Sequence, residues 1–345
     1  MSASLRPVSG SAGEILALLR EWDAARSAEP LVIATSGSTG EPKRVVLSRE
    51  ALRASASATH QRLDGPGQWV LNLPATYVAG LQVLYRSVLA GTEPLVFEGS
   101  WRQTLARTAG PTYVSLVPTQ LVRLLRAPDL AAEVDALGRC AAVLIGGGPL
   151  DPRVREEAER RGLRIVQTYG MSETCGGCVY DGLPLAGVEV HIDDGAVLLR
   201  GPMLFDGYEG DAERTRAVLR EGWFHTFDLG HWEDQRLRID GRADDVVISG
   251  GVKVPAAAVV AGLERQPEVA AACVVGVPDD EWGERVVAVL VPRAEPTRSL
   301  DPDPSLPRAW WPKDLVWVPS LPLLPNGKPD RLRARELATA ELTRG

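Results

Sequence analysis

A run of hydroxyl, glycine and lysine residues directly after an apolar stretch is the feature that most constrains this chain. Residues 31–34 read Leu-Val-Ile-Ala and predict a buried strand. In the loop that follows, Gly37 and Gly40 permit positive φ angles that turn backbone N–H groups inward, and Lys43 adds a positive charge. The pattern predicts a loop that wraps a polyphosphate, with a flexible serine–glycine linker as the alternative.

The loop is not of the Walker A type. Pro42 precedes the lysine, and Arg44 follows it where that pattern has serine or threonine. The candidate phosphate-binding residues share a hydroxyl, a glycine backbone or a cation, and they are Ser36, Gly37, Ser38, Thr39, Gly40 and Lys43.

Three further segments are compatible with the same chemistry. Residues 166–174 place an aromatic ring, hydroxyls and a carboxylate at the exit of a strand predicted over 164–166. Residues 227–228 and 241–245 flank a predicted β-hairpin, and residues 325–328 put a lysine on a tight turn. Four ordered motifs make the linker interpretation of the first one weak.

These motifs, spread over residues 35–331, resemble those of the acyl-adenylate-forming superfamily, which includes acyl-CoA synthetases, peptide-synthetase adenylation domains and luciferases. The resemblance implies that Glu173 holds Mg²⁺ between the phosphates of ATP and that Thr39 and its neighbours clamp the leaving pyrophosphate. It also implies that Lys328 bridges the acid and the α-phosphate, a contact worth most in the transition state. Lys328, Glu173 and Thr39 are therefore the implied catalytic residues.

The resemblance also assigns the nucleoside. Tyr169 is expected to stack on adenine, and Asp228 with Arg242 to bind the ribose hydroxyls. The other residues implied in ATP binding are Gly147, Gly148, Pro149, Thr168, Gly170, Met171 and Ser172. Each charged group has a structural alternative. Glu173 can be a carboxylate at a helix N-terminus, Asp228 a turn former, Arg242 one half of a surface pair with Asp244, and Lys328 a solvated cation.

Helices are predicted over 11–26, with Ser11 as the cap, from Ser48 onward, and over 80–90, 100–108, 118–126 and 151–161. Strand-like and helix-like segments alternate from residue 69 to residue 166, which predicts an α/β fold with a mostly parallel sheet covered by helices. Short alternating strands over 182–240 predict a small β-subdomain. We expect a large ATP- and acid-binding domain over 1–243, followed by a small mobile α+β lid over 244–345 that carries Lys328.

The lid is expected to serve a second reaction with coenzyme A. In the resembled family it swings about a hinge, and Asp244 matches that position. Gly250 and Gly251 are then expected to line the pantetheine channel, because glycine permits close backbone approach. A lid that exchanges Lys328 for Gly251 accounts for two reactions at one site.

The charge and hydropathy of the chain argue against some classes of binding partner. The net charge of −7 and the sequence pI of about 5.3 provide no basic field for nucleic acid or anionic lipid. No apolar run reaches the ~18 residues of a membrane span, and the N-terminus lacks the pattern of a signal peptide, so a cytoplasmic protein without stable membrane insertion is expected. A homodimer is the commonest soluble arrangement. The early phosphate loop implies a reduced N-terminal region compared with most relatives.

The four cysteines are too sparse for a disulfide framework. Cys175 and Cys178 form a C-x-x-C pair, but a zinc or redox site needs a second ligand pair or a thioredoxin-like setting. Small residues lining a pocket are the favoured interpretation.

The acid is indicated by a narrower resemblance. Residues 77–87 and 174–182 are most similar to short bacterial o-succinylbenzoate-CoA ligases of menaquinone biosynthesis. Gly176 and Gly177 leave room for a flat ring, and Arg86 is a candidate to bind a second carboxylate, with a surface or interface arginine as its alternative. Tyr77 stands where the family often has the histidine of Pro-x-x-His-x-x-Gly, a motif that ends here at Gly80.

One other departure from the family pattern is Phe227, which replaces the glycine before the ribose aspartate.

Three alternatives for the function remain at this point. These are a CoA ligase for another aromatic or fatty acid, an adenylation domain that loads a carrier protein, and a non-catalytic relative. Retention of Lys328, Glu173 and Asp228 argues against the last.

Overall fold

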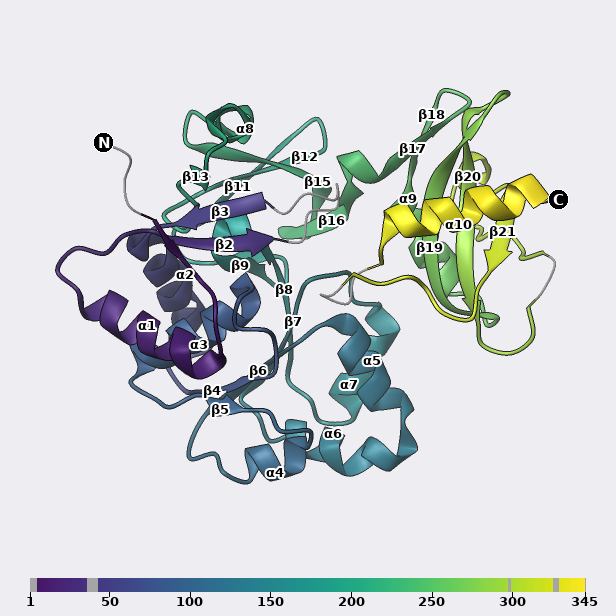
Figure 1. The fold of residues 1–345 in the computed structure, drawn as a ribbon. Helices are drawn as coiled ribbons and strands as arrows, with labels where there is room; N and C mark the ends of the chain where they lie inside the picture. Colours follow the sequence, from purple (N-terminus) through teal and green to yellow (C-terminus); the bar gives the residue numbers. More distant parts are fainter. Residues whose placement is uncertain (1–4, 36–42, 297–298, 325–328, 345) are drawn as a thin grey trace.

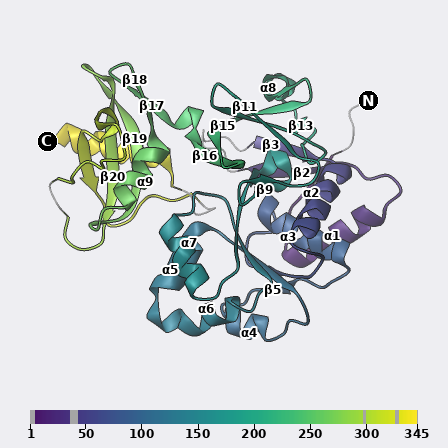
Figure 2. The same cartoon turned by 180° about the vertical axis from the view of Figure 1, so that it is seen from behind.

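The computed structural model describes residues 5–35, 43–296, 299–324 and 329–344 of the 345-residue chain. Figure 1 shows a larger unit formed by the N-terminal part of the chain and a smaller unit, green to yellow, formed by the C-terminal part. Figure 2 shows the same two units from behind. Within the described residues the larger unit contains a 4-stranded, a 7-stranded and a 5-stranded sheet, and the smaller unit contains a second 5-stranded sheet.

The 7-stranded sheet organises the larger unit, with strand order β10-β9-β8-β7-β6-β4-β5. The pairs that join β5, β4, β6, β7 and β8 are parallel, while β9 pairs antiparallel with β8 and with β10. The prediction of a mostly parallel sheet is confirmed. Its strands are β4 (Gln68–Leu71), β5 (Leu95–Val96), β6 (Thr112–Leu116), β7 (Ala142–Ile145), β8 (Ile165–Met171), β9 (Gly176–Tyr180) and β10 (Leu183–Pro184).

Helices cover both faces of this sheet. Successive strand residues point to opposite sides, and since apolar residues occur on both sides, both faces must be buried. Trp69 and Tyr113 belong to one apolar core, whereas Val70 and Val114 belong to another. The covering helices are α1 (Ala12–Ala24), α2 (Arg49–Arg62), α3 (Val78–Ala90), α4 (Trp101–Leu105), α5 (Pro118–Arg126), α6 (Ala131–Leu137) and α7 (Pro152–Arg160), with the 3₁₀ turn η1 (Pro128–Leu130) between α5 and α6. All but α6 and η1 match a predicted helix.

Two serines begin the helices on either side of the phosphate loop, as predicted. The Ser11 hydroxyl accepts from the backbone N–H of Glu14, and the Glu14 carboxylate accepts from the backbone N–H of Ser11, which forms a capping box before α1. The Ser48 hydroxyl accepts from the backbone N–H of Ala51 at 3.3 Å and caps α2.

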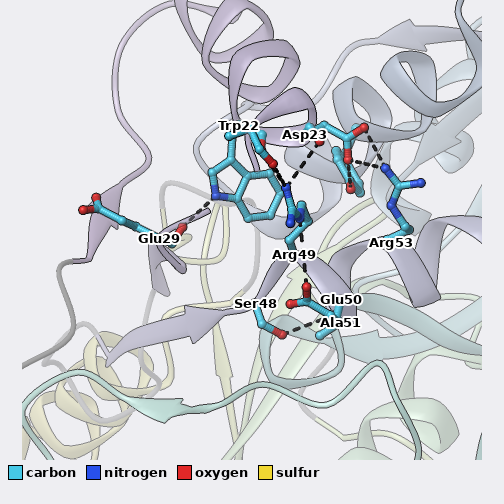
Figure 3. A network of polar contacts seen from close by, with 10 residues as sticks. Trp22, Asp23, Glu29, Ser48, Arg49, Glu50, Ala51 and Arg53 are labelled. Carbon is cyan, nitrogen blue, oxygen red and sulfur yellow. Dashed lines mark hydrogen bonds and ion pairs between the residues drawn. The ribbon is translucent and has the colours of Figure 1, made fainter. Parts of the chain in front are cut away.

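A polar network joins the end of α1 to the start of α2 (Figure 3). Arg49 donates to the carbonyl of Ala25 at 2.5 Å and to those of Trp22 and Asp23 at 3.4 Å, which satisfies acceptors left open at a helix C-terminus. Arg53 donates to both carboxylate oxygens of Asp23 at 2.7 and 2.8 Å. The network holds together the two helices that flank the phosphate loop.

Two antiparallel strands, β2 (Leu31–Thr35) and β3 (Lys43–Leu47), enclose that loop. They lie in the 4-stranded sheet of order β1-β2-β3-β13. Its outer strands are β1 (Arg6–Pro7) and β13 (Gly207–Tyr208).

The predicted β-subdomain is confirmed as the first 5-stranded sheet, although the helix α8 (Ala212–Val218) within it was not predicted. Its long strands pair so that Asp228 lies opposite Arg242. The strands are β11 (Glu189–Asp193), β12 (Ala196–Arg200), β14 (Leu219–Arg220), β15 (Trp223–Glu233) and β16 (Arg236–Arg242).

The smaller unit is α+β, as predicted, and its C-terminal helix was not foreseen. The elements of this unit are η3 (Ala243–Asp245), β17 (Val246–Ser249), β18 (Val252–Pro255), α9 (Ala256–Glu264), β19 (Val269–Asp279), β20 (Gly283–Pro292), η4 (Arg308–Trp310), β21 (Asp314–Trp317) and α10 (Arg331–Arg344).

Among the residues that the structure describes, no helix has both the length and the apolar character needed to cross a membrane.

Candidate active site

The phosphate loop is closed at its base. Thr35 at the end of β2 pairs with Lys43 at the start of β3, and the Thr35 hydroxyl donates to the Lys43 carbonyl at 3.5 Å. The predicted phosphate-binding residues Ser36, Gly37, Ser38, Thr39 and Gly40 lie outside the described residues. The two strands fix where the loop leaves and rejoins the sheet.

Lys43 reaches the predicted metal carboxylate. Its Nζ atom lies 4.0 Å from Oε1 of Glu173, which sits on the 3₁₀ turn η2 (Ser172–Thr174) after β8. The Tyr208 hydroxyl, from β13, donates to the same Oε1 at 2.8 Å. Burial and the neighbouring Glu173 carboxylate raise the pKa of Tyr208, so its hydroxyl stays a donor. Sequence reasoning missed Tyr208, because nothing local marks it.

A lone carboxylate suits Mg²⁺ held mainly by phosphates and water. Glu173 is 8% exposed, and no cluster of three or more potential ligands occurs among the described residues. Magnesium in nucleotide sites usually takes one or two carboxylates together with phosphate oxygens. The donor set therefore fits the metal ion.

Asp228 joins two other predicted residues. It is 7% exposed, Tyr169 donates to its Oδ2 at 2.7 Å, and Arg242 donates to its Oδ1 at 3.3 Å. Burial, followed by the Asp228 charge, raises the pKa of Tyr169. The structure thus brings Tyr169, Asp228 and Arg242 together from three separate strands or strand ends.

The strand that carries Tyr169 is longer than predicted. The prediction ended it at residue 166 and placed 168–171 in a loop, but β8 continues to Met171. This part of the prediction was wrong because β9 pairs antiparallel with Thr168, Tyr169, Gly170 and Met171. Gly170 permits that approach, since a Cβ there would lie 2.1 Å from the carbonyl oxygen of Gly176.

The glycine loop after β7 lies beside this strand. A Cβ on Gly146 would lie 2.4 Å from the Thr168 hydroxyl, and Gly147 has a φ of +81°. Residues 147–149, expected to border the adenine, therefore follow the end of the neighbouring parallel strand. Ligands bind at such strand ends in sheets of this kind.

The glycines predicted to line the acid pocket are packed on one side by side chains. A Cβ on Gly176 would lie 3.3 Å from Gln82 Cγ, and one on Gly177 would lie 2.7 Å from a ring carbon of Tyr180. The Gln82 amide donates to the carbonyl of Cys175 at 2.7 Å. These contacts join the start of β9 to α3.

Arg86 is buried, so the surface interpretation is wrong. Arg86 is 4% exposed. Its Nη2 atom donates to the Tyr180 hydroxyl at 3.4 Å, and its guanidinium lies 4.8 Å from the Trp69 ring centroid. Burial lowers the pKa of Arg86. In the described structure no carboxylate pairs with it.

Several buried polar atoms on nearby elements also lack a hydrogen-bond partner in the described structure. Burial and the Arg86 charge lower the pKa of His60 to about 4, and its Nε2 has no hydrogen-bond partner in the described structure. The other buried atoms on α3 and near the end of β4 without a partner there are Nε1 of Trp69, both amide atoms of Asn72, Oε1 of Gln82 and Nε of Arg86. Buried polar groups in native interiors are usually hydrogen-bonded, so these atoms are available to pair with a polar ligand group or with water. Asn72 could have been foreseen, because it directly follows a strand.

Other predicted residues lie around this region or in the smaller unit. Tyr77 begins α3 without a side-chain cap, and a Cβ on Gly80 would lie 2.3 Å from the Pro74 carbonyl oxygen, so Gly80 serves close packing. Asp244 lies in η3. Gly250 and Gly251 form the β17–β18 turn with φ values of +56° and +77°. Lys328 lies outside the described residues.

The buried thiols of the C-x-x-C pair have raised pKa values. Burial raises the pKa of Cys178 to about 12 and also raises that of Cys175, whose carbonyl accepts from Ser55 at 2.9 Å. Thiols in this state are poor nucleophiles and metal ligands.

Two family models match the chain: AMP-binding enzyme over residues 23–209, and AMP-binding enzyme C-terminal domain over residues 258–328. A Mycobacterium tuberculosis H37Rv protein named "Probable 2-succinylbenzoate–CoA ligase" is 40% identical over 325 residues, which cover 87% of this chain and 82% of that protein. The 2-succinylbenzoate–CoA ligase of Listeria monocytogenes serotype 4b is 31% identical over 346 residues, which cover 94% and 73%.

A solved structure shares the fold. The o-succinylbenzoate CoA synthetase from Bacillus subtilis, in complex with its acyl-adenylate intermediate, matches with a TM-score of 0.76 and 26% identity over 88% of this chain and 68% of that chain. The same enzyme in complex with ATP and a magnesium ion matches with a TM-score of 0.75 and 26% identity, over 88% and 69%.

Proposed function

The chain belongs to the AMP-binding enzyme family and is an AMP-forming acid–CoA ligase, and from this premise we propose that its acid substrate is o-succinylbenzoate. The product is then o-succinylbenzoyl-CoA, and the reaction is a step of menaquinone biosynthesis. Relatives and a solved structure that carry this activity in their names support the proposal.

Arg86 is the observation that carries the choice of acid. A buried guanidinium without a carboxylate partner is costly, and an anionic ligand group offsets that cost. The aromatic ring of o-succinylbenzoate bears such a carboxylate, while its succinyl carboxylate remains available for reaction. Arg86 contacts Tyr180, and Tyr180 packs on Gly177, so one side chain separates the guanidinium from a glycine predicted to line the acid pocket.

In the first reaction, an oxygen of the succinyl carboxylate attacks the α-phosphorus of ATP and pyrophosphate leaves. Glu173 and Lys43 present one anion and one cation to the magnesium–phosphate group, with Ser36–Gly40 of the loop as further donors. Bound magnesium screens the phosphate charge. Lys328 neutralises charge that develops between acid and α-phosphate.

The nucleoside is held along β8. Asp228 offers its carboxylate to the ribose hydroxyls, with Arg242 and Tyr169 fixing its orientation. The Tyr169 ring and residues 147–149 border the adenine. Orientation by these contacts supplies part of the rate gain, because reacting atoms are held in line.

In the second reaction, the sulfur of CoA attacks the carbonyl carbon of the adenylate and AMP leaves. Gly251 suits a passage for pantetheine, because a Cβ at that position would have nothing within 4 Å. Gly250 instead packs against Trp282, at 2.7 Å from its ring. Rotation at Asp244 brings this turn to the site.

Replacing Asp244 with proline tests that rotation. Proline fixes φ and restricts the hinge, so adenylation should stay within about threefold of wild type while thioester formation falls at least tenfold. The two steps are measured as pyrophosphate release without CoA and as conversion of supplied adenylate with CoA. Asp244→Ala, which leaves φ unrestricted, is the control. Equal loss of both steps in Asp244→Pro contradicts the hinge assignment.

An acid panel tests the proposed substrate. Pyrophosphate release is measured with ATP, Mg²⁺ and either o-succinylbenzoate, 4-oxo-4-phenylbutyrate, benzoate or a medium-chain fatty acid, with and without CoA. The second acid lacks only the ring carboxylate. A site built to pair that group should prefer o-succinylbenzoate by roughly 10²-fold in kcat/KM, because the analogue leaves buried donors unsatisfied.

Equal or better turnover of the analogue or the fatty acid would remove the menaquinone assignment and leave the acid–CoA ligase activity. Transfer to a phosphopantetheinyl protein, in place of free CoA, would indicate a carrier-loading enzyme instead.

A further inference from the structure

Phe227 exposes an aromatic ring beside the nucleotide residues. On β15 its neighbours Thr226 and Asp228 are buried, at 8% and 7% exposure, whereas Phe227 points to the other side and is 46% exposed. A large apolar side chain gains little from burial at that exposure. Core packing therefore contributes little at this position, and the contacts of the ring distinguish it from other exposed apolar residues.

Two cations face this ring. Lys43 Nζ lies 5.8 Å from the ring centroid of Phe227, and the guanidinium carbon of Arg242 lies 5.9 Å from it. Both distances are within the ~6 Å over which a cation is attracted to an aromatic face. The ring thus links a cation of the phosphate loop to a cation of the ribose site.

Lys43 is enclosed on further sides. Its Nζ lies 5.5 Å from the ring centroid of Tyr208 and 4.0 Å from Oε1 of Glu173, and its side chain is only 18% exposed. The two rings and the carboxylate form a half-cage around the ammonium group. Such a cage limits the rotamers of a long, flexible side chain before a ligand arrives, which reduces the entropy lost on binding.

We propose that Phe227 is a positioning residue that holds Lys43 and Arg242 in the arrangement that receives MgATP. The inference rests on the proposed function, since it takes Lys43 to contact the β- and γ-phosphates and Arg242 to act at the ribose. Phe227 itself is not taken to contact the carboxylate oxygen or the α-phosphorus that react. It acts through the two cations.

The test is the dissociation constant of MgATP and of AMP, measured by titration calorimetry in the absence of acid. Phe227→Leu keeps apolar volume and removes the π face, and should weaken MgATP binding about fivefold, because Lys43 and Arg242 lose the contacts that hold them in place before the ligand arrives. AMP lacks the phosphates that Lys43 contacts, so its binding should weaken by only about twofold. Phe227→Tyr, which keeps the ring, should bind both nucleotides within twofold of wild type.

Trp232→Leu is the matched control, because Trp232 is a 43% exposed aromatic residue farther along the same strand, opposite Leu237. It should bind MgATP as wild type does. Thermal midpoints of all variants should lie within a few degrees of wild type, since the replaced rings are exposed.

Three results would overturn the proposal: wild-type MgATP affinity in Phe227→Leu, equal weakening of AMP and MgATP, or a Phe227→Tyr protein as weak as Phe227→Leu. Failure of the proposed function gives a different result. Wild-type protein that binds no MgATP contradicts the ligase activity, and wild-type protein that binds MgATP but rejects o-succinylbenzoate contradicts only the choice of acid.

Discussion

Lys328→Ala should lower acid-dependent adenylate formation by about 10²-fold or more, with a much smaller effect on nucleotide binding. Removal of one donor that stabilises transition-state charge has this size of effect. Although Lys328 lies outside the described residues, the chain on either side is held together: Leu323 bridges Pro329, and the backbone N–H of Asp330 donates to the Pro322 carbonyl at 2.8 Å. Pyrophosphate release under saturating ATP and acid measures the effect.

Lys253→Ala is the control for that variant, because Lys253 is an exposed lysine on the same small unit, in β18. It should retain wild-type adenylation. Acyl-adenylate supplied to Lys328→Ala should still react with CoA, since the second reaction uses a different face of the lid. If that conversion is lost as well, the scheme of two lid positions is wrong.

Arg86→Met should lower kcat/KM for o-succinylbenzoate by about 10³-fold, because the ring carboxylate would be buried without its counter-charge. That factor corresponds to about 4 kcal/mol, within the range measured when one partner of a buried charge pair is removed. Activity toward 4-oxo-4-phenylbutyrate should change by less than about tenfold, since that analogue has no ring carboxylate. The roughly 10²-fold preference for o-succinylbenzoate should therefore disappear or reverse in favour of the analogue.

Stability separates this role from a structural one. Arg86 has no carboxylate partner among the described residues, so its replacement by methionine removes an uncompensated buried charge and should leave the free energy of unfolding unchanged or raise it. Arg62→Met is the matched control, because Arg62 also contacts Tyr180, at its backbone carbonyl 3.2 Å away. A large loss of stability in Arg86→Met, or equal loss of activity toward both acids, would show that Arg86 is structural.

Local signals gave correct predictions where the interaction is local. Ser11 and Ser48 cap helices through residues three positions away, and the alternation of strand-like and helix-like segments identified the parallel part of the sheet. The helices α6, α8 and α10 were missed. β8 was predicted too short because its last residues are held by β9, a strand whose pairing is not visible in the local pattern.

The sequence by itself determined the order of the motifs, the family and the chemical type of most candidate residues, because glycines, hydroxyls and charges at fixed spacing report on local backbone and charge requirements. Only the tertiary structure decided which of them meet. It brought Lys43 and Tyr208 to Glu173, and Tyr169 to Asp228, across separate strands. It also buried Arg86 among polar atoms without partners. Burial and long-range contact depend on packing between distant segments, and no local pattern encodes them.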